Sequence, residues 1–181
     1  CAELARRSGL VVVTGGRTAA AQLILSSLGV DVISTAETRF SKDRGLHQRG
    51  TAIAVLRKQG ASFAVVATHL DLNEDARLRH VGELEQAIAT HVSADVPTVV
   101  AGDMNDRPGS RTWQALTRDR RDAFAVAGTG SGFTSTATNP HQRIDGIFVD
   151  RRITVRQAEV IMHPDAALAS DHLPVLAELE I

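Results

Sequence analysis

Residues 63–101 read FAVVATHLDLNEDARLRHVGELEQAIATHVSADVPTVVA, and their hydrophobic pattern changes twice. Phe63–Ala67 is a continuous apolar run, which predicts a strand buried on both faces. From Asn73 to Val92 apolar residues recur at three- and four-residue steps, which predicts an amphipathic helix with Asn73 as its N-cap. Pro97–Ala101 is apolar again and predicts a second strand. This stretch therefore predicts strand, helix and strand in succession, with Arg77 and Arg79 on the solvated face of the helix.

Shorter apolar runs on both sides of this stretch predict further elements. Strands are expected at Val30–Ile33, Ala52–Leu56, Ile144–Val149, Ile153–Ile161 and Val175–Leu179, and a short helix is expected at Ser110–Leu116 with Trp113 and Leu116 facing inward. Because strands outnumber helices and regular strand–helix alternation is rare, we expect an α+β sandwich and not a doubly wound sheet. No repeat or linker divides the chain, so we expect residues 1–181 to form a single domain.

The amino-acid composition argues against some classes of binding partner. Twenty Lys and Arg against 21 Asp and Glu give a net charge of −1, and aromatic residues make up 3% with no Tyr. This argues against a global basic field or a stacking surface for nucleic acid. No apolar run reaches the length of a membrane span, about 18–20 residues. One cysteine is consistent with a reducing compartment, so a cytoplasmic location is slightly favoured.

Polar clusters lie at the ends of four predicted strands. They are Thr68-His69-Leu70-Asp71, Gly102-Asp103-Met104-Asn105-Asp106, Arg143-Ile144-Asp145-Gly146 and Ser170-Asp171-His172-Leu173-Pro174. Each cluster places a carboxylate, amide or imidazole beside an apolar run, where an unpaired charge would be costly. Side chains from these distant segments can converge on one rim of the sandwich.

Each cluster also has a purely structural interpretation. His69 could be an ordinary hydrogen-bonded residue at a strand end, and Asp103 with Asn105 could form an Asx-turn. Asp145 could be a turn former, and Asp171 could cap the turn before the final strand. Four clusters of the same composition at strand ends are hard to assign to turns alone, so together they favour a functional site.

The residue types in these clusters point to phosphoester chemistry. Carboxylate and amide oxygens are hard ligands that suit Mg²⁺ or Mn²⁺, with Asp103 and Asn105 among the candidates. Two histidines among such ligands suit a site that binds a phosphate and stabilises developing negative charge. No Ser or Cys occupies a nucleophile-elbow motif. We therefore expect direct attack by an activated water.

With these residues assembled, the chain resembles the endonuclease/exonuclease/phosphatase superfamily. The four clusters follow the order of that superfamily, and Gln48-Arg49-Gly50 resembles its Arg-Gly strand entry. The resemblance extends from about Leu23 onward. It implies a four-layer α/β/β/α sandwich, similar to deoxyribonuclease, with the site at one end of two packed sheets.

The resemblance also implies roles for individual residues. Asp103 would orient or deprotonate the attacking water, and Asn105 would help hold water and phosphate. His69 and His172 would contact phosphoryl oxygens, with Asp145 orienting His172. Asp171, one position before that histidine, would be a metal ligand.

One departure from the superfamily concerns its first two strands, which carry a metal-binding Asn and a Leu-Gln-Glu sequence. Neither is present here, and the chain starts at a Cys, so we expect an N-terminally incomplete fold. The sequence from Asp31 to Glu37 mimics the Glu strand, but Glu37 lies too close to His69 in the sequence and is interpreted as a chance match. A sheet that lacks these strands would expose an unpaired edge and bind metal weakly.

The leading hypothesis is a metal-dependent hydrolase acting on a phosphoester or phosphodiester, with a small substrate favoured. The alternatives are a catalytically inactive binding protein of the same fold and a nuclease acting on DNA or RNA. Residues Arg39–Arg44, with His47 and Arg49, could form a basic lip for a phosphate-rich substrate. A solvated loop is the preferred interpretation of that segment.

Overall fold

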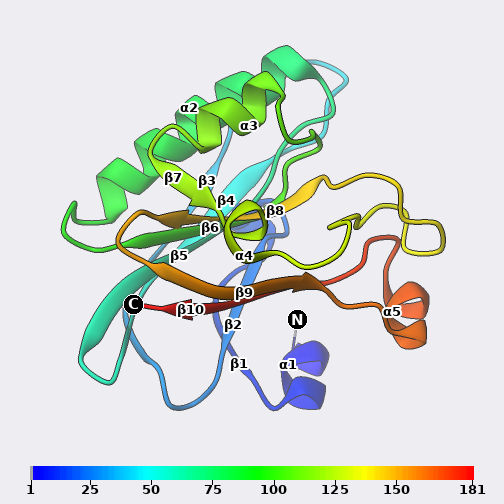
Figure 1. The fold of residues 1–181 in the computed structure, drawn as a ribbon. Coiled ribbons are helices and arrows are strands. Elements are labelled where there is room, and N and C mark those ends of the chain that lie inside the picture. Colours follow the sequence, from blue (N-terminus) through cyan, green and yellow to red (C-terminus); the bar gives the residue numbers. More distant parts are fainter. Residues whose placement is uncertain (1) are drawn as a thin grey trace.

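The computed structural model describes residues 2–181 and shows a mixed α and β fold built around one six-stranded sheet (Figure 1). The strand order is β3 (Asp31–Arg39), β4 (Gly50–Lys58), β5 (Ala61–His69), β6 (Thr98–Asp103), β8 (Asp145–Asp150) and β7 (Arg120–Asp122). β5 and β6 are parallel, whereas the other neighbouring pairs are antiparallel. The strand–helix–strand prediction for residues 63–101 is confirmed.

The helix that joins β5 to β6 covers one face of this sheet. α2 (Glu74–His91) begins after Asn73, whose side chain accepts a hydrogen bond from the backbone N–H of Ala76 at 3.0 Å, so the predicted N-cap is confirmed. Leu84 of α2 is fully buried against the apolar face of β5 and β6. The short helix α3 (Arg111–Leu116) lies beside α2 in Figure 1 and buries Trp113 and Leu116, as predicted.

The position predicted for Arg77 was wrong. Its guanidinium is buried and donates to Asp106 Oδ2 at 3.2 Å, to Thr112 Oγ1 at 3.1 Å, and to the carbonyls of Asp71 and Leu72 at 2.9 Å each. Asp71 and Leu72 immediately precede α2, whereas Asp106 and Thr112 belong to the segment after β6, which sequence periodicity does not place near α2. Arg77 therefore ties the end of β5 to the segment that follows β6.

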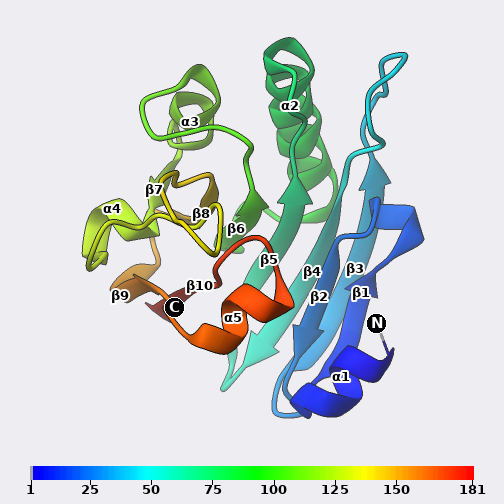
Figure 2. The same cartoon turned by 90° about the vertical axis from the view of Figure 1, so that its right-hand side faces the viewer.

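The second layer consists of two separate hairpins, one from each end of the described chain. β1 (Val11–Gly15) pairs with β2 (Leu23–Ser26), and β9 (Thr154–Val160) pairs with β10 (Val175–Glu180). Within residues 2–181 no ladder joins these two hairpins. Figure 2 shows them as separate ribbons on either side of β5.

The separation of the hairpins changes the burial of β5. Val66 faces α2 and is fully buried, whereas its neighbours Val65 and Ala67 face the second layer and are only partly covered. An open cleft of about 610 Å³ lies on this inner face, lined by Phe63 and Val65 of β5 and by Leu179 of β10. The prediction of a strand buried on both faces was therefore wrong for this strand.

Two short helices lie on the outer side of the second layer, and a third packs between the edge of the main sheet and the second hairpin. α1 (Ala2–Ser8) and α5 (Pro164–Ala169) lie beyond the hairpins, on the side opposite α2 in Figure 1. α4 (Ala123–Ala127) packs near β9, where the side chains of Phe124 and Ala127 contact the cluster around Val155 and Ala158. The layers therefore follow the expected α/β/β/α order. No helix in the described part of the chain is long and apolar enough to span a membrane.

Candidate active site

Three of the predicted polar residues lie side by side in one row across the main sheet. His69 ends β5, Asp103 ends β6 and Asp145 begins β8, and the strand register pairs His69 with Asp103 and Asp103 with Asp145. Residues paired across a ladder point to the same face of a sheet. All three side chains therefore project from one edge of the sheet, on the face that carries the hairpins.

A glycine allows β5 and β6 to approach at this point. Gly102 has φ +153°, and a Cβ placed on it would lie 1.8 Å from the carbonyl oxygen of Thr68. A larger residue would force the strands apart directly beside His69 and Asp103. The glycine therefore contributes to the spacing of the site.

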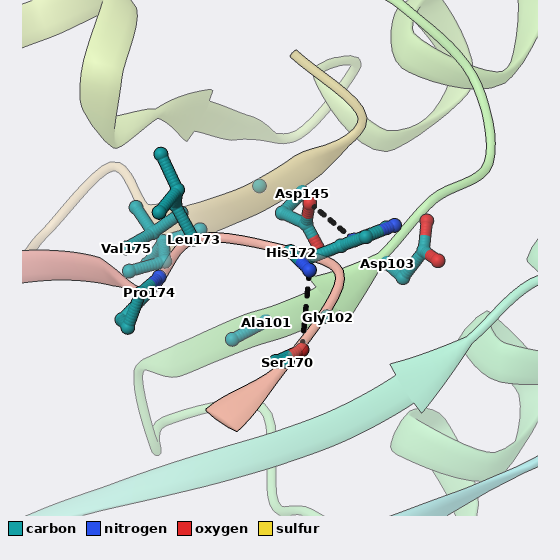
Figure 3. A pocket seen from close by; sticks show the side chains of 11 residues that line it. Ala101, Gly102, Asp103, Asp145, Ser170, His172, Leu173, Pro174 and Val175 are labelled. Atoms are coloured by element: carbon teal, nitrogen blue, oxygen red, sulfur yellow. Dashed lines mark hydrogen bonds and ion pairs between the residues drawn. The ribbon is translucent and has the colours of Figure 1, made fainter. Parts of the chain in front are cut away.

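The fourth residue, His172, reaches the row from the loop between α5 and β10. Its backbone N–H donates to Ser170 Oγ at 3.1 Å, and its Nδ1 lies 2.9 Å from Asp145 Oδ2. Figure 3 shows the imidazole extending from Asp145 toward Asp103. One donor atom each from Asp103, Asp145 and His172 lie within 4.8 Å of one another.

Asn105 connects two of these residues. It adopts φ +48°, a left-handed conformation that Asn tolerates better than most residues, and its N–H donates to Asp103 Oδ1 at 2.8 Å. Its side-chain amide donates to the carbonyl of Leu70 at 2.9 Å and lies 3.0 Å from His69 Nε2. The Asx-turn and the functional interpretation of Asp103 and Asn105 are thus compatible, because the turn itself orients the site.

The surroundings of the two histidines shift their pKa values in opposite directions. Burial, helped by the nearby charge of Arg49, lowers the pKa of His69 to about 4. A neutral His69 accepts the Asn105 amide at Nε2, so its 3.3 Å contact with Asp103 Oδ2 is not an ion pair at neutral pH. Burial would also lower the pKa of His172, but its hydrogen bond to Asp145 and the surrounding carboxylates outweigh burial and raise that pKa.

The surroundings of Asp103 raise the proton affinity of its carboxylate. Burial raises its pKa, and the nearby charge of Asp145 acts in the same direction, while the N–H of Asn105 opposes both. Asp103 therefore binds a proton more readily than an exposed Asp. This is the direction expected for a group that accepts a proton from water.

Two other acidic residues lie outside the group. Asp171 is exposed, and although its charge helps to raise the pKa of His172, its carboxylate is not among the atoms gathered within 4.8 Å. Glu37 lies on β3, three strands from Asp103. Its carboxylate accepts hydrogen bonds from Thr14, Thr18 and the N–H of Gly15, so the structure gives it a local role at the first hairpin.

Sequence reasoning missed two supporting arginines. Arg143, which the sequence motif places beside Asp145 without a role of its own, forms a bidentate pair with buried Asp122 at 3.0 and 2.8 Å and lies over Trp113. Arg49 was grouped with a solvated loop, but its side chain is only 14% exposed, whereas Arg44 of the same loop is exposed. Neither position carries a local pattern that distinguishes it from a surface arginine.

A cavity of about 380 Å³ opens beside the cluster. Asp103, Asp145 and His172 line its polar end, and Ile147, Leu173 and Val175 are among the apolar residues that line the rest. The structure thus brings together the five predicted catalytic residues, His69, Asp103, Asn105, Asp145 and His172. Asp103, Asp145 and His172 line the cavity, and His69 and Asn105 contact Asp103 beside it. Such an arrangement can hold an anion and transfer a proton.

Comparisons with known proteins agree with this architecture. The model of the Endonuclease/Exonuclease/phosphatase family matches residues 13–172. A mannosyl-6-phosphatase from Bacteroides thetaiotaomicron is 17% identical with a TM-score of 0.85, over 99% of this chain and 80% of that one. An endonuclease/exonuclease/phosphatase from Bacteroides vulgatus is 24% identical with a TM-score of 0.83, over 97% and 78% of the two chains.

A more distant likeness is to D. rerio TDP2 in complex with a single-strand DNA product. It is 14% identical with a TM-score of 0.72, over 99% of this chain and 81% of that one. No curated protein matches the sequence. Because the family match spans most of the chain and the fold agrees, this chain belongs to the endonuclease/exonuclease/phosphatase family.

Proposed function

We propose that this chain is a Mg²⁺- or Mn²⁺-dependent phosphoesterase that uses direct attack by water. The observation that carries the proposal is the row of His69, Asp103 and Asp145 at one sheet edge, joined by His172 through a 2.9 Å contact with Asp145. Membership of a family of phosphoester hydrolases supports the reaction class. The similar structures include a phosphatase and a protein bound to a DNA product.

The donor set fits a hard divalent cation. Asp103 and Asp145 offer carboxylate oxygens within 4.8 Å of each other, the ligand type that Mg²⁺ and Mn²⁺ prefer. These two carboxylates would hold the ion, with Asp171 and the amide oxygen of Asn105 as further proposed ligands. Such an ion would supply Lewis-acid stabilisation of the phosphoryl oxygens.

Three side chains of the site would carry out proton transfer and contact the phosphoryl group. Asp103, with its raised pKa, would take a proton from the water that attacks phosphorus. His172, whose pKa is raised by its hydrogen bond to Asp145, would donate a hydrogen bond to a phosphoryl oxygen on which negative charge develops. Neutral His69 would hydrogen-bond to the phosphoryl group without adding a full charge.

The test compares hydrolysis of bis(p-nitrophenyl) phosphate in Mn²⁺ by three variants. Asp103→Asn and His172→Gln should each lose about 10²-fold or more in kcat/KM, as expected for a general base and a charge-stabilising group. Asp150→Asn is the matched control, because Asp150 lies at the opposite end of β8 from Asp145 and pairs with Arg152. Turnover like the wild type in both site variants would overturn the proposal.

The inactive binding protein and the nuclease are distinguished by two further measurements. Calorimetric titration with Mn²⁺ should show a site that Asp171→Ala weakens, and the absence of any metal binding would favour a non-catalytic role. Hydrolysis of plasmid DNA that falls steeply with added salt would favour the nuclease. A small phosphoester is the favoured substrate, because the chain has a net charge of −1 and few aromatic residues.

A further inference from the structure

Arg49 is a largely buried cation whose donors have no protein partner. Its side chain is 14% exposed, and its Nε is buried without a hydrogen bond. The nearest carboxylate oxygen is Asp71 Oδ2, which lies 3.9 Å from Nε and beyond hydrogen-bond distance. Asp71 instead accepts the N–H of Asn73 at Oδ1. The carboxylate thus offsets part of the charge of Arg49 but leaves its donors free.

Other buried or partly buried arginines of the described chain have hydrogen-bond partners. Arg121 also has a buried Nε without a partner, but its Nη2 donates to two backbone carbonyls. Arg77 makes hydrogen bonds to a carboxylate, a hydroxyl and two carbonyls. Arg120 forms a bidentate pair with Glu85, and Arg143 forms one with Asp122. Burying a charged group without hydrogen bonds is costly, so a guanidinium in this state is suited to a ligand that brings acceptor oxygens.

The position of Arg49 places that ligand at the candidate active site. Arg49 immediately precedes Gly50, which pairs with His69 in the β4–β5 ladder. The Nε of Arg49 lies 3.9 Å from Oδ2 of Asp71, two residues after His69, so the guanidinium lies beside the end of β5. Consistent with this position, its charge lowers the pKa of both His69 and Asp103. The planar fork of donors in a guanidinium matches two oxygens of a tetrahedral oxyanion such as phosphate.

We propose that Arg49 is a phosphate-binding residue whose guanidinium donates to non-bridging oxygens of the phosphoryl group bound beside Asp103 and His172. The proposal rests on the function proposed above, because it assigns the position of the substrate's phosphoryl group. The proposal applies to Arg49 and not to Lys42 or Arg44 of the same segment, because the side chains of these two residues are exposed. Of the basic lip considered from the sequence, Arg39–Arg44 with His47 and Arg49, only the largely buried Arg49 is proposed to bind phosphate.

The test measures the affinity of the metal-free protein for inorganic phosphate by NMR titration. Arg49→Ala should weaken phosphate binding by about 10- to 100-fold, the loss expected for a charge-assisted hydrogen bond. Arg49→Lys retains a charge beside Asp71 but lacks the planar fork, so its affinity should fall between those of the alanine variant and the wild type. Arg44→Ala is the matched control from the same loop and should bind phosphate like the wild type.

A purely structural role gives a different result. If Arg49 served only as the ionic neighbour of Asp71, Arg49→Ala would lower the melting temperature while the folded protein kept its phosphate affinity. Unchanged affinity in both Arg49 variants would overturn the proposal. Asp103→Asn keeps this test separate from the proposed function, because it should lower kcat/KM by about 10²-fold or more and retain phosphate binding. Turnover like the wild type in Asp103→Asn would therefore refute the mechanism and leave the role of Arg49 to the titration.

Discussion

Replacing Asp122 with Ala should destabilise the protein more than any exposed ion pair could. The carboxylate is buried and accepts hydrogen bonds from four residues. Trp113 Nε1 donates at 2.8 Å, Arg143 donates twice at 3.0 and 2.8 Å, and the N–H groups of Phe124 and Ala125 donate at the start of α4. One substitution therefore leaves a mostly buried guanidinium unpaired and removes a helix N-cap.

The expected magnitude follows from these contacts. Breaking a buried ion pair by removing one partner costs about 3–5 kcal/mol, because the other charge stays buried. Loss of the N-cap adds about 1 kcal/mol. The total of about 4–6 kcal/mol corresponds to a fall in Tm of about 8–24 °C for a domain of this size. Urea and thermal unfolding followed by circular dichroism measure both quantities.

The matched control removes the same group from an exposed pair. Asp31 lies 3.5 Å from Arg57, and their side chains are 71% and 50% exposed, so Asp31→Ala should cost no more than about 1 kcal/mol. The double variant Asp122→Ala/Arg143→Met should recover part of the loss, because no buried charge is left without a partner. If Asp122→Ala were as stable as Asp31→Ala, the reasoning from the buried network would be refuted.

Three further predictions concern the site. Gly102→Ala should cost at least about 2 kcal/mol in urea unfolding, since the added methyl group meets the carbonyl of the neighbouring strand. Gly82→Ala, at an open position in α2, should instead stabilise by about 0.5–1 kcal/mol, and equal effects of the two would contradict the argument. The pKa of His69 falls from 6.5 to about 4 on folding, so the unfolded chain binds more protons between these values. The free energy of unfolding should therefore fall as pH drops through this window, and His69→Gln should flatten the slope in acid titrations. Asp145→Asn should lower the pKa of His172, measured by NMR, and an unchanged pKa would remove Asp145 as its orienting partner.

Local patterns predicted much of the fold. The three- and four-residue spacing within Asn73–Val92 predicted α2 with its cap, and the apolar runs predicted the strands that carry the site. These elements can be predicted from the sequence because the residues on the buried face of a helix or strand recur at a short, regular spacing. Sequence reasoning failed at Arg77 and on the inner face of Phe63–Ala67, because both depend on what other segments lie against them.

The sequence by itself determined which residue types make up the candidate site, because His69, Asp103, Asn105, Asp145 and His172 stand at or near strand ends in an order that resembles a known family. Only the tertiary structure decided how these groups meet. Strand register aligns the row, and a loop more than 20 residues away brings the second imidazole to it. The tertiary structure also decided which charged side chains lie beside His69, Asp103 and Asp145, because the burial of a side chain and the loss of its hydrogen-bond partners depend on contacts between distant segments. For this reason, the phosphate-binding role that we propose for Arg49 could be inferred only once the tertiary structure was known.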